Sequence, residues 1–194
     1  MTILLIGALG AVGRLLHRGL PEATGQQLIG VDRAPGADLR WDLDTVDYAD
    51  PAVRATLTGA DVVIHVATSP DPYADAAVHW QAVASATRLL QACNNTDVPA
   101  VLLPSSGWAE PAGLGLRQNS YGRSKQVLES LAAMYAQQPG RAAEALRIGW
   151  VPHHPDDLAG ADPAIASSYW PADRVVSEFA AAVARLSSTI SSAT

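Results

Sequence analysis

A tyrosine and a lysine stand four residues apart in the segment 119–125, which reads NSYGRSK. At this spacing Tyr121 and Lys125 lie on the same face of a helix. A phenol with an ordinary pKa near 10 is a poor proton donor at neutral pH, and a nearby ammonium group lowers that pKa. Lys125 is also the single lysine of a chain that otherwise uses arginine. The pair predicts acid–base chemistry, with Tyr121 as the group that gives or takes the proton.

A glycine-rich turn, GALGAVG at residues 7–13, follows the apolar run 2–6 and precedes an amphipathic segment. Glycines at this spacing let the backbone approach a pyrophosphate, and the N-terminus of the following helix offers free N–H groups and a positive dipole end. The pattern predicts dinucleotide binding, with Lys125 reaching the nicotinamide ribose. The turn residues expected to contact the cofactor are Gly7, Leu9, Gly10, Ala11, Val12 and Gly13.

Acidic residues follow at positions suited to an adenosine. Asp32 comes 19 residues after Gly13, where a carboxylate accepts hydrogen bonds from the ribose hydroxyls. A carboxylate there repels a 2′-phosphate and favours NAD, while the adjacent Arg33 acts toward NADP. Asp42 and Leu43 follow a short candidate strand, and Asp42 has two open interpretations, an adenine contact or a solvated loop residue.

Apolar runs alternate with helical patterns along the chain, which predicts an α/β fold. We expect a Rossmann-like doubly wound parallel sheet with helices on both faces. Strands are predicted at 2–6, 27–32, 61–67, 100–105 and 143–150, and helices at 11–20, 51–57, 75–93, 121–137 and 173–186. Residues 1–186 form one domain in this interpretation, with a minimal C-terminal substrate region, and residues 187–194 form a flexible tail.

Composition excludes several classes of partner. The chain of 194 residues has a net charge of −6 and no Lys/Arg-rich run, which argues against nucleic acid. It has no apolar stretch of the ~20 residues that a membrane span needs and no signal peptide, so we expect no membrane association. One cysteine, Cys93, excludes an internal disulfide and suits the cytoplasm. The five histidines show no metal-ligand spacing, so no metal is expected.

The motifs in their order along the chain resemble a known family. The glycine turn, Asp32, the serine pair at 105–106 and Tyr-x-x-x-Lys look like the short-chain dehydrogenase/reductase superfamily. The G-x-x-G-x-x-G spacing, the Tyr-Gly-x-Ser-Lys context and the Leu-Arg run at 145–149 are similar to its extended branch. That branch contains NAD-dependent sugar epimerases, dehydratases and uronate dehydrogenases.

The resemblance implies roles for further residues. Ser105 and Ser106 are both candidates for the serine that polarises a substrate carbonyl, and Ser106 is preferred. The segment 65–69 replaces the family's Asn-Ala-Gly-like run, so its residues are expected beside the cofactor (Val66, Ala67, Thr68) and the substrate (Ser69). Other residues expected at the substrate are Gly107, Trp108, Trp150 and His153. Packing is an equal alternative for Trp108, and a solvated loop is the alternative for His153.

The expected function is an NAD(P)-dependent oxidoreductase that interconverts a ketone and a secondary alcohol on a small polar substrate. A sugar, a uronic acid or a nucleoside-like metabolite would suit, as in a biosynthetic tailoring ketoreductase. Two alternatives stay open, a nucleotide-sugar epimerase or dehydratase and a non-catalytic NAD(P)-binding regulator. The resemblance also implies a homodimer, formed by the two long helices at 75–93 and 121–137.

Overall fold

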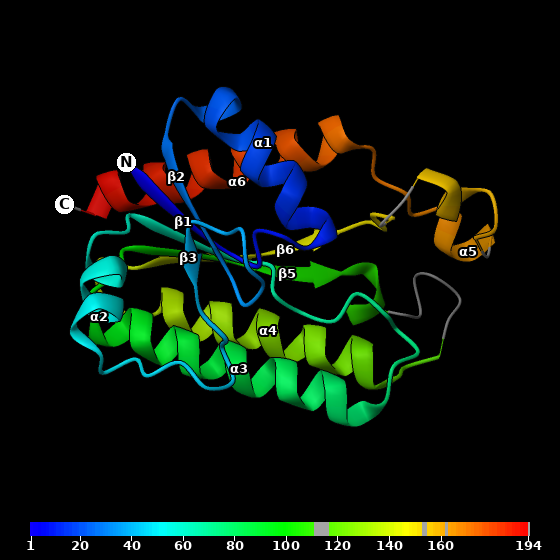
Figure 1. Ribbon diagram of the computed structural model, residues 1–194, viewed down its shortest axis with the longest axis horizontal. Coiled ribbons are helices and arrows are strands. Elements are labelled where there is room, and N and C mark those ends of the chain that lie inside the picture. The colour runs from blue at the N-terminus through cyan, green and yellow to red at the C-terminus, as the bar shows by residue number, and fades with distance from the viewer. Residues whose placement is uncertain (111–116, 153–154, 162, 194) are drawn as a thin grey trace.

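The computed structural model describes residues 1–110, 117–152, 155–161 and 163–193. In these residues, six strands form one parallel sheet in the order β3-β2-β1-β4-β5-β6 (Figure 1). The strands are β1 (Thr2–Ile6), β2 (Gln27–Asp32), β3 (Leu39–Arg40), β4 (Val62–His65), β5 (Ala100–Ser106) and β6 (Ala142–Ile148). This order confirms the predicted doubly wound fold, because it reverses direction between β1 and β4.

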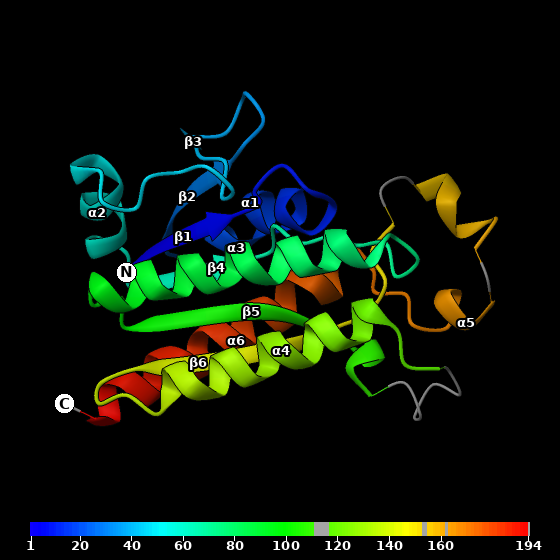
Figure 2. The same ribbon diagram turned by 90° about the horizontal axis from the view of Figure 1, so that it is seen from below.

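Helices cover both faces of the sheet. The α-helices are α1 (Ala11–Thr24), α2 (Pro51–Thr58), α3 (Ala76–Asn95), α4 (Ser120–Ala136), α5 (Pro163–Ala166) and α6 (Ala172–Ala193). Helices α1 and α6 lie on one face, whereas α3 and α4 lie side by side on the other (Figures 1 and 2). Two short 3-10 helices, η1 (Gly107–Ala109) and η3 (Pro155–Leu158), follow β5 and β6.

Two apolar cores sandwich the sheet, because successive residues of a strand point to opposite faces. In β1, Ile3 and Leu5 pack against α1 and α6, and Leu4 and Ile6 pack toward α3 and α4. All four are fully or almost fully buried. Burial of each such side chain stabilises the folded state by about 1.5–3 kcal/mol. This stabilisation fixes the central strands and the loops at their carboxyl ends.

Two predicted helix ends are wrong. Helix α1 was expected to stop at Leu20, but it continues through Pro21 to Thr24 and ends at Gly25, which adopts a left-handed φ of 66°. Helix α6 continues from Leu186 through the predicted tail to Ala193. Its serine-rich end remains helical, with Ser187 and Ser188 donating hydrogen bonds to carbonyls four residues earlier.

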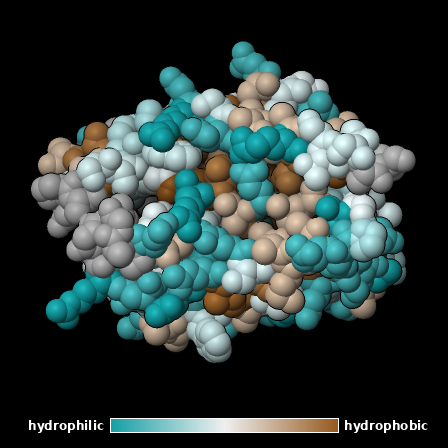
Figure 3. Space-filling model, turned by 180° about the vertical axis from the view of Figure 1, so that it is seen from behind, coloured by the Kyte–Doolittle hydropathy of each residue, from teal (hydrophilic) through white to brown (hydrophobic). Residues whose placement is uncertain are grey.

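On the face shown in Figure 3, polar residues predominate and apolar residues show between them. No helix within the described residues is both long enough and apolar enough to cross a membrane.

Candidate active site

The glycine turn lies between β1 and α1, at the point where the strand order reverses. Gly7 has φ +91°, and a Cβ there would come within 2.6 Å of the Ala67 nitrogen in the loop after β4. A Cβ at Gly13 would lie 1.9 Å from the Gly7 carbonyl oxygen. At Gly10, by contrast, a Cβ would meet one atom within 4 Å, the Gly7 oxygen at 3.4 Å. Gly7 and Gly13 therefore shape the turn, whereas Gly10 keeps the groove beside it open.

Asp32 ties the end of β2 to this turn. Its Oδ2 accepts a hydrogen bond of 2.9 Å from the Leu9 N–H, and its Oδ1 accepts one of 3.0 Å from the Ala34 N–H. The carboxylate is thus fixed at the rim of a groove of about 790 Å³. The predicted cofactor residues that line this groove are Gly7, Leu9, Gly10, Asp32, Arg33, Asp42, Leu43, Val66, Ala67 and Thr68.

A turn at residues 42–44 forms another part of the groove wall, and the sequence did not predict how it is held in place. The Asp42 Oδ1 accepts a hydrogen bond from the Asp44 N–H. The Asp44 carboxylate accepts hydrogen bonds from the Ser85 hydroxyl at 2.5 Å and from the Gln81 side-chain amide at 3.0 Å. These bonds, the one from Ser85 first, hold the pKa of Asp44 below its usual range. The groove wall is therefore anchored to α3 through Asp44, a residue that no sequence motif singled out.

The start of α4 positions Tyr121. Asn119 caps the helix by accepting the Gly122 N–H at 2.8 Å, and its amide donates to the Pro72 carbonyl at 2.9 Å. Gly122 lies against η1, because a Cβ there would stand 2.2 Å from the Trp108 carbonyl oxygen. The Tyr-Gly pair thus lets the turn after β5 pack directly on the helix that carries the tyrosine.

Tyr121 and Lys125 share one helix face, as their spacing predicts. The Lys125 ammonium lies 4.9 Å from the centre of the Tyr121 ring and donates a hydrogen bond of 3.0 Å to the Thr68 hydroxyl. Burial lowers the pKa of Lys125 to about 8. The pKa of Tyr121 is raised by burial, and an interaction with the Ser106 side chain acts in the opposite direction. The expected net lowering by Lys125 is therefore wrong in this structure, because burial of the phenol dominates.

A buried histidine lies behind the lysine. His65 ends β4 and is fully buried, and neither ring nitrogen has a hydrogen-bond partner among the described residues. Burial, followed by the charge of Lys125, lowers the pKa of His65 to about 3. The imidazole is therefore neutral at physiological pH and adds no second positive charge beside Lys125.

His79 on α3 contacts both Tyr121 and the residue before it. Its Nδ1 lies 2.8 Å from the Ser120 hydroxyl and its Nε2 lies 3.0 Å from the Asp71 carbonyl oxygen. The ring also meets the Tyr121 ring edge to face, with centroids 5.5 Å apart. This one side chain connects α3, the loop after β4 and the start of α4. Its role depends on three distant segments, so sequence spacing gave no sign of it.

The two serines at the end of β5 have different partners. The Ser106 hydroxyl accepts the Trp108 N–H at 3.4 Å and acts on the pKa of Tyr121. The Ser105 hydroxyl instead donates to Glu129 at 2.6 Å. Both serines line the cavity beside Tyr121, and the hydroxyl of Ser105 is the one that already donates to Glu129.

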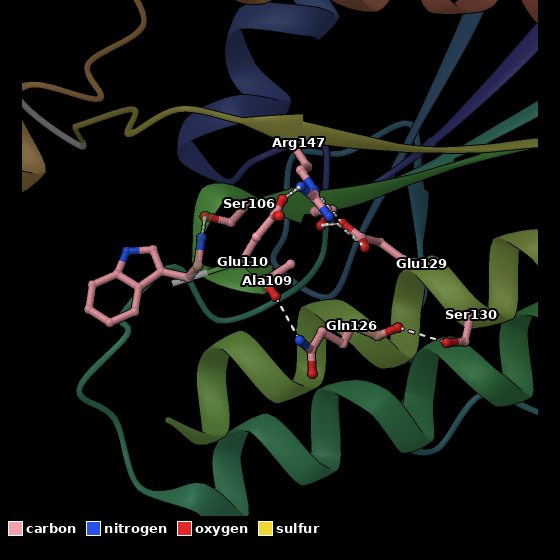
Figure 4. Close-up of polar contacts among 9 residues, drawn as sticks. Ser106, Ala109, Glu110, Gln126, Glu129, Ser130 and Arg147 are labelled. Atoms are coloured by element: carbon pink, nitrogen blue, oxygen red, sulfur yellow. Dashed lines mark hydrogen bonds and ion pairs between the residues drawn. The ribbon is translucent and has the colours of Figure 1, made fainter. Parts of the chain in front are cut away.

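Ser105 belongs to a charged network through its bond to Glu129. Figure 4 shows Arg147 of this network between Glu110 and Glu129. The Arg147 guanidinium binds Glu129 through Nε at 2.7 Å and Glu110 through a terminal nitrogen at 2.7 Å. The bond from Arg147, the larger cause, and the one from Ser105 lower the pKa of Glu129. The network joins β5, β6 and α4, and the pairing of Ser105 with Arg147 across the two strands places its members together.

A cavity of about 190 Å³ opens beside the tyrosine. Its lining includes four residues predicted at the substrate, Ser69, Ser106, Trp108 and Trp150, whereas Gly107 is not among the described residues of its lining. Tyr121 and Lys125 also line it, as do Ala11 and Val12, which were predicted at the cofactor. His153 lies outside the described residues. The sequence interpretation missed Ile148, Val151, Ile165 and Ser168, which come from the end of β6 and the region around α5. Their loops have no periodic pattern that would have placed them there.

The reversal of strand order, the glycine turn and the carboxylate after β2 define a Rossmann-type dinucleotide-binding domain. Within the described parts of the chain, no group of His, Cys, Asp and Glu side chains could hold a metal ion. Residues 3–151 match the NAD dependent epimerase/dehydratase family, and the chain belongs to that family. Among curated proteins, no sequence matches it significantly.

Solved structures share this fold. A short-chain dehydrogenase/reductase superfamily protein from Agrobacterium tumefaciens with bound NAD is 22% identical, with a TM-score of 0.61 over 77% of this chain and 49% of that one. UDP-N-acetylglucosamine 4-epimerase from Bacillus cereus is 20% identical, with a TM-score of 0.62 over 77% of this chain and 53% of that one. A partial consensus L-threonine 3-dehydrogenase is 23% identical, with a TM-score of 0.63 over 75% and 52%. The chain spans about half the length of these proteins.

Proposed function

We propose that the protein is an NAD-dependent oxidoreductase that interconverts a ketone and a secondary alcohol on a small substrate. The observation that carries this proposal is the placement of Tyr121 between Lys125 and Ser106 in the wall of a cavity next to the glycine turn. Carbonyl reduction requires a proton donor, a cation beside that donor and a hydroxyl that binds the carbonyl oxygen. Tyr121, Lys125 and Ser106 can supply these groups. Family membership supports the same class of chemistry.

The groove fits NAD. The open space at Gly10 leaves room for a pyrophosphate at the N-terminus of α1, where free N–H groups meet it. The Asp32 carboxylate has further lone pairs for the ribose hydroxyls and repels a 2′-phosphate. Arg33, on the exposed side of Asp32, is the residue that would admit NADP, so we propose NAD as the preferred cofactor and NADP as the weaker one.

The proposed reaction balances one hydride against one proton. NADH, when bound in the groove, would supply two electrons as a hydride to the carbonyl carbon. Tyr121 donates its phenolic proton to the carbonyl oxygen, and Ser106 donates a hydrogen bond to the same oxygen. The Lys125 ammonium, 4.9 Å from the ring, stabilises the phenolate that remains. The alcohol carries away the proton, and solvent returns one to Tyr121.

Replacement of the proton donor tests the proposal. We expect Tyr121→Phe to lower kcat by about 10²–10⁴, the usual contribution of a positioned acid, because the ring stays and the proton is lost. NADH binding should be unchanged. The matched control is Tyr73→Phe, which removes a hydroxyl from an exposed tyrosine that contacts Trp108. Turnover of a ketone panel with NADH and NADPH is the measurement, and unchanged activity in Tyr121→Phe would refute the proposed role.

An epimerase or dehydratase that uses the hydride only transiently is the second candidate, and membership of the NAD dependent epimerase/dehydratase family favours it. The two reactions differ in their cofactor balance. A reductase consumes NADH in proportion to its product, whereas an epimerase or dehydratase releases product with no net change at 340 nm, the absorbance of NADH.

We further propose a homodimer through α3 and α4. An apolar hollow of about 420 Å³ lies between these helices, and Trp80 beside it is 75% exposed. A projecting ring and a hollow on one face suit a second copy related by a twofold axis. We expect Trp80→Arg to give a monomer by light scattering after gel filtration, whereas Glu22→Arg on α1 should remain dimeric. A monomeric wild-type protein would contradict the proposal.

A further inference from the structure

The cavity beside Tyr121 differs from the cofactor groove in both size and charge. It holds about 190 Å³, against about 790 Å³ for the groove. Drug-sized ligands occupy pockets of roughly 300–1,000 Å³, so the cavity suits a much smaller molecule. Among the described residues of its lining, Lys125 is the one charged side chain, and its ammonium is almost fully buried and bound to Thr68.

The arginine on the adjacent strand is turned away from this cavity. Arg147 and Ile148 are consecutive in β6, so their side chains point to opposite faces. Ile148 lines the cavity, while the Arg147 guanidinium lies on the α4 side between Glu129 and Glu110 (Figure 4). The two carboxylates of that network, Glu129 and Glu110, are in turn bound by Arg147. Because these charged groups pair with one another on the α4 side, neither the guanidinium nor the carboxylates line the cavity.

Much of the remaining wall is apolar or aromatic, and it also carries hydroxyl side chains, those of Thr68, Ser69, Ser105, Ser106 and Ser168. Trp108 follows β5, Trp150 follows β6, and Ile165 comes from α5. The ring of Trp108 meets the ring of Tyr121 edge to face at 6.2 Å, so an aromatic surface adjoins the proton donor. Such surfaces favour the faces of rings and C–H groups. The polar groups near Tyr121 are hydroxyls, which suffice to orient one carbonyl oxygen.

We propose that the substrate is a small, uncharged ketone, or the matching secondary alcohol, whose carbonyl carbon is attached to an apolar ring. This inference rests on the proposed function and narrows its substrate class. A carboxylate or a diphosphate placed in this cavity would lose its hydration and would find Lys125 as its one described cationic partner, whose ammonium is already bound to Thr68 and lies beside the Tyr121 ring. Such incomplete pairing of a buried anion is strongly unfavourable. Carboxylated ketones and nucleotide-diphosphate sugars are thus poor ligands for the site.

A matched pair of probes tests the proposal on the intact protein. Acetophenone and 4-acetylbenzoate share the ketone and the ring and differ by one carboxylate. We expect acetophenone to have the higher kcat/KM with NADH by at least about tenfold, the effect of leaving the carboxylate unpaired. UDP-glucose should neither turn over nor inhibit at saturating NADH. Equal or better turnover of the charged ketone, or tight binding of UDP-glucose, would overturn the inference.

A charge-restoring variant sharpens the test. Ser168→Arg adds a cation to the cavity wall, and we expect it to reduce the preference for acetophenone by about threefold or more, while Glu22→Arg on the exposed side of α1 leaves it unchanged. An unchanged preference in Ser168→Arg with normal NADH affinity would count against the proposal.

Binding separates this inference from the proposed reaction. Calorimetry on the NAD⁺-saturated protein measures 1-phenylethanol against 4-(1-hydroxyethyl)benzoate without requiring turnover. Preferential binding of the neutral alcohol with no turnover of either ketone would refute the oxidoreductase and support the substrate class. Binding of neither alcohol would overturn the substrate class while NAD binding remained intact.

Discussion

The two halves of the sheet build their ligand surfaces in different ways. On the β1–β2 side, the cofactor groove depends on backbone geometry, with glycines that admit no side chain and a carboxylate held by two N–H groups. On the β5–β6 side, the cavity beside Tyr121 depends on side chains brought together from α4, β6 and the region around α5, and His79 of α3 contacts the start of α4. Backbone geometry tolerates few substitutions, whereas a wall of side chains can change with the substrate.

The largest expected effect separates two glycines of the backbone-built half. Gly13→Ala should destabilise the fold by at least about 3 kcal/mol, the upper end of overpacking costs, because its Cβ would meet the Gly7 carbonyl oxygen at 1.9 Å. Gly10→Ala should fold normally and bind NADH more weakly, since its Cβ projects into the groove. Urea unfolding and NADH fluorescence titration measure the two effects, and similar stability losses in both variants would contradict the assignment.

An intermediate effect concerns Lys125, which lies between the two halves. Its pKa of about 8 is below the ordinary 10.5, so the folded state binds fewer protons than the unfolded state between these pH values. Stability of the wild type relative to Lys125→Met should therefore rise by about 1–3 kcal/mol from pH 7 to pH 10. Denaturant unfolding at both pH values measures the gap. Parallel pH profiles for the two proteins would show that burial does not shift this lysine.

The smallest expected effect on kcat concerns the hydrogen bonds of His79 to Ser120 and Asp71. Loss of one neutral hydrogen bond costs about 0.5–1.5 kcal/mol, so kcat should fall by roughly 2- to 10-fold in each single variant. His79→Asn can retain the contact to Ser120, and His79→Gln can retain the contact to Asp71. If the bond to Ser120 positions Tyr121, Asn should preserve kcat better than Gln, with NADH affinity equal in both. The reverse order would assign the positioning to the loop after β4.

The same contrast explains what the sequence could predict. The glycine turn, Asp32 and the Tyr121–Lys125 pair are local patterns, in which a few consecutive residues dictate both geometry and chemistry. The network of Ser105, Glu129 and Arg147 required the register of β5 against β6, which no local pattern encodes. The pKa of Tyr121 was predicted with the wrong sign, since burial depends on segments that are distant in sequence. The serine-rich end of α6 was predicted as a tail because its composition resembles a linker.

The contact between Gly122 and η1 has a consequence for engineering. The group that approaches position 122 is the main-chain carbonyl of Trp108, whereas the indole forms part of the cavity wall. The contact of α4 with η1 thus depends on main-chain atoms of position 108, while the indole ring contacts the ring of Tyr121. Saturation mutagenesis at this codon should alter substrate scope while α4 stays packed on η1, and aromatic replacements should best keep the ring contact to Tyr121, which makes it the natural first site for a directed-evolution library.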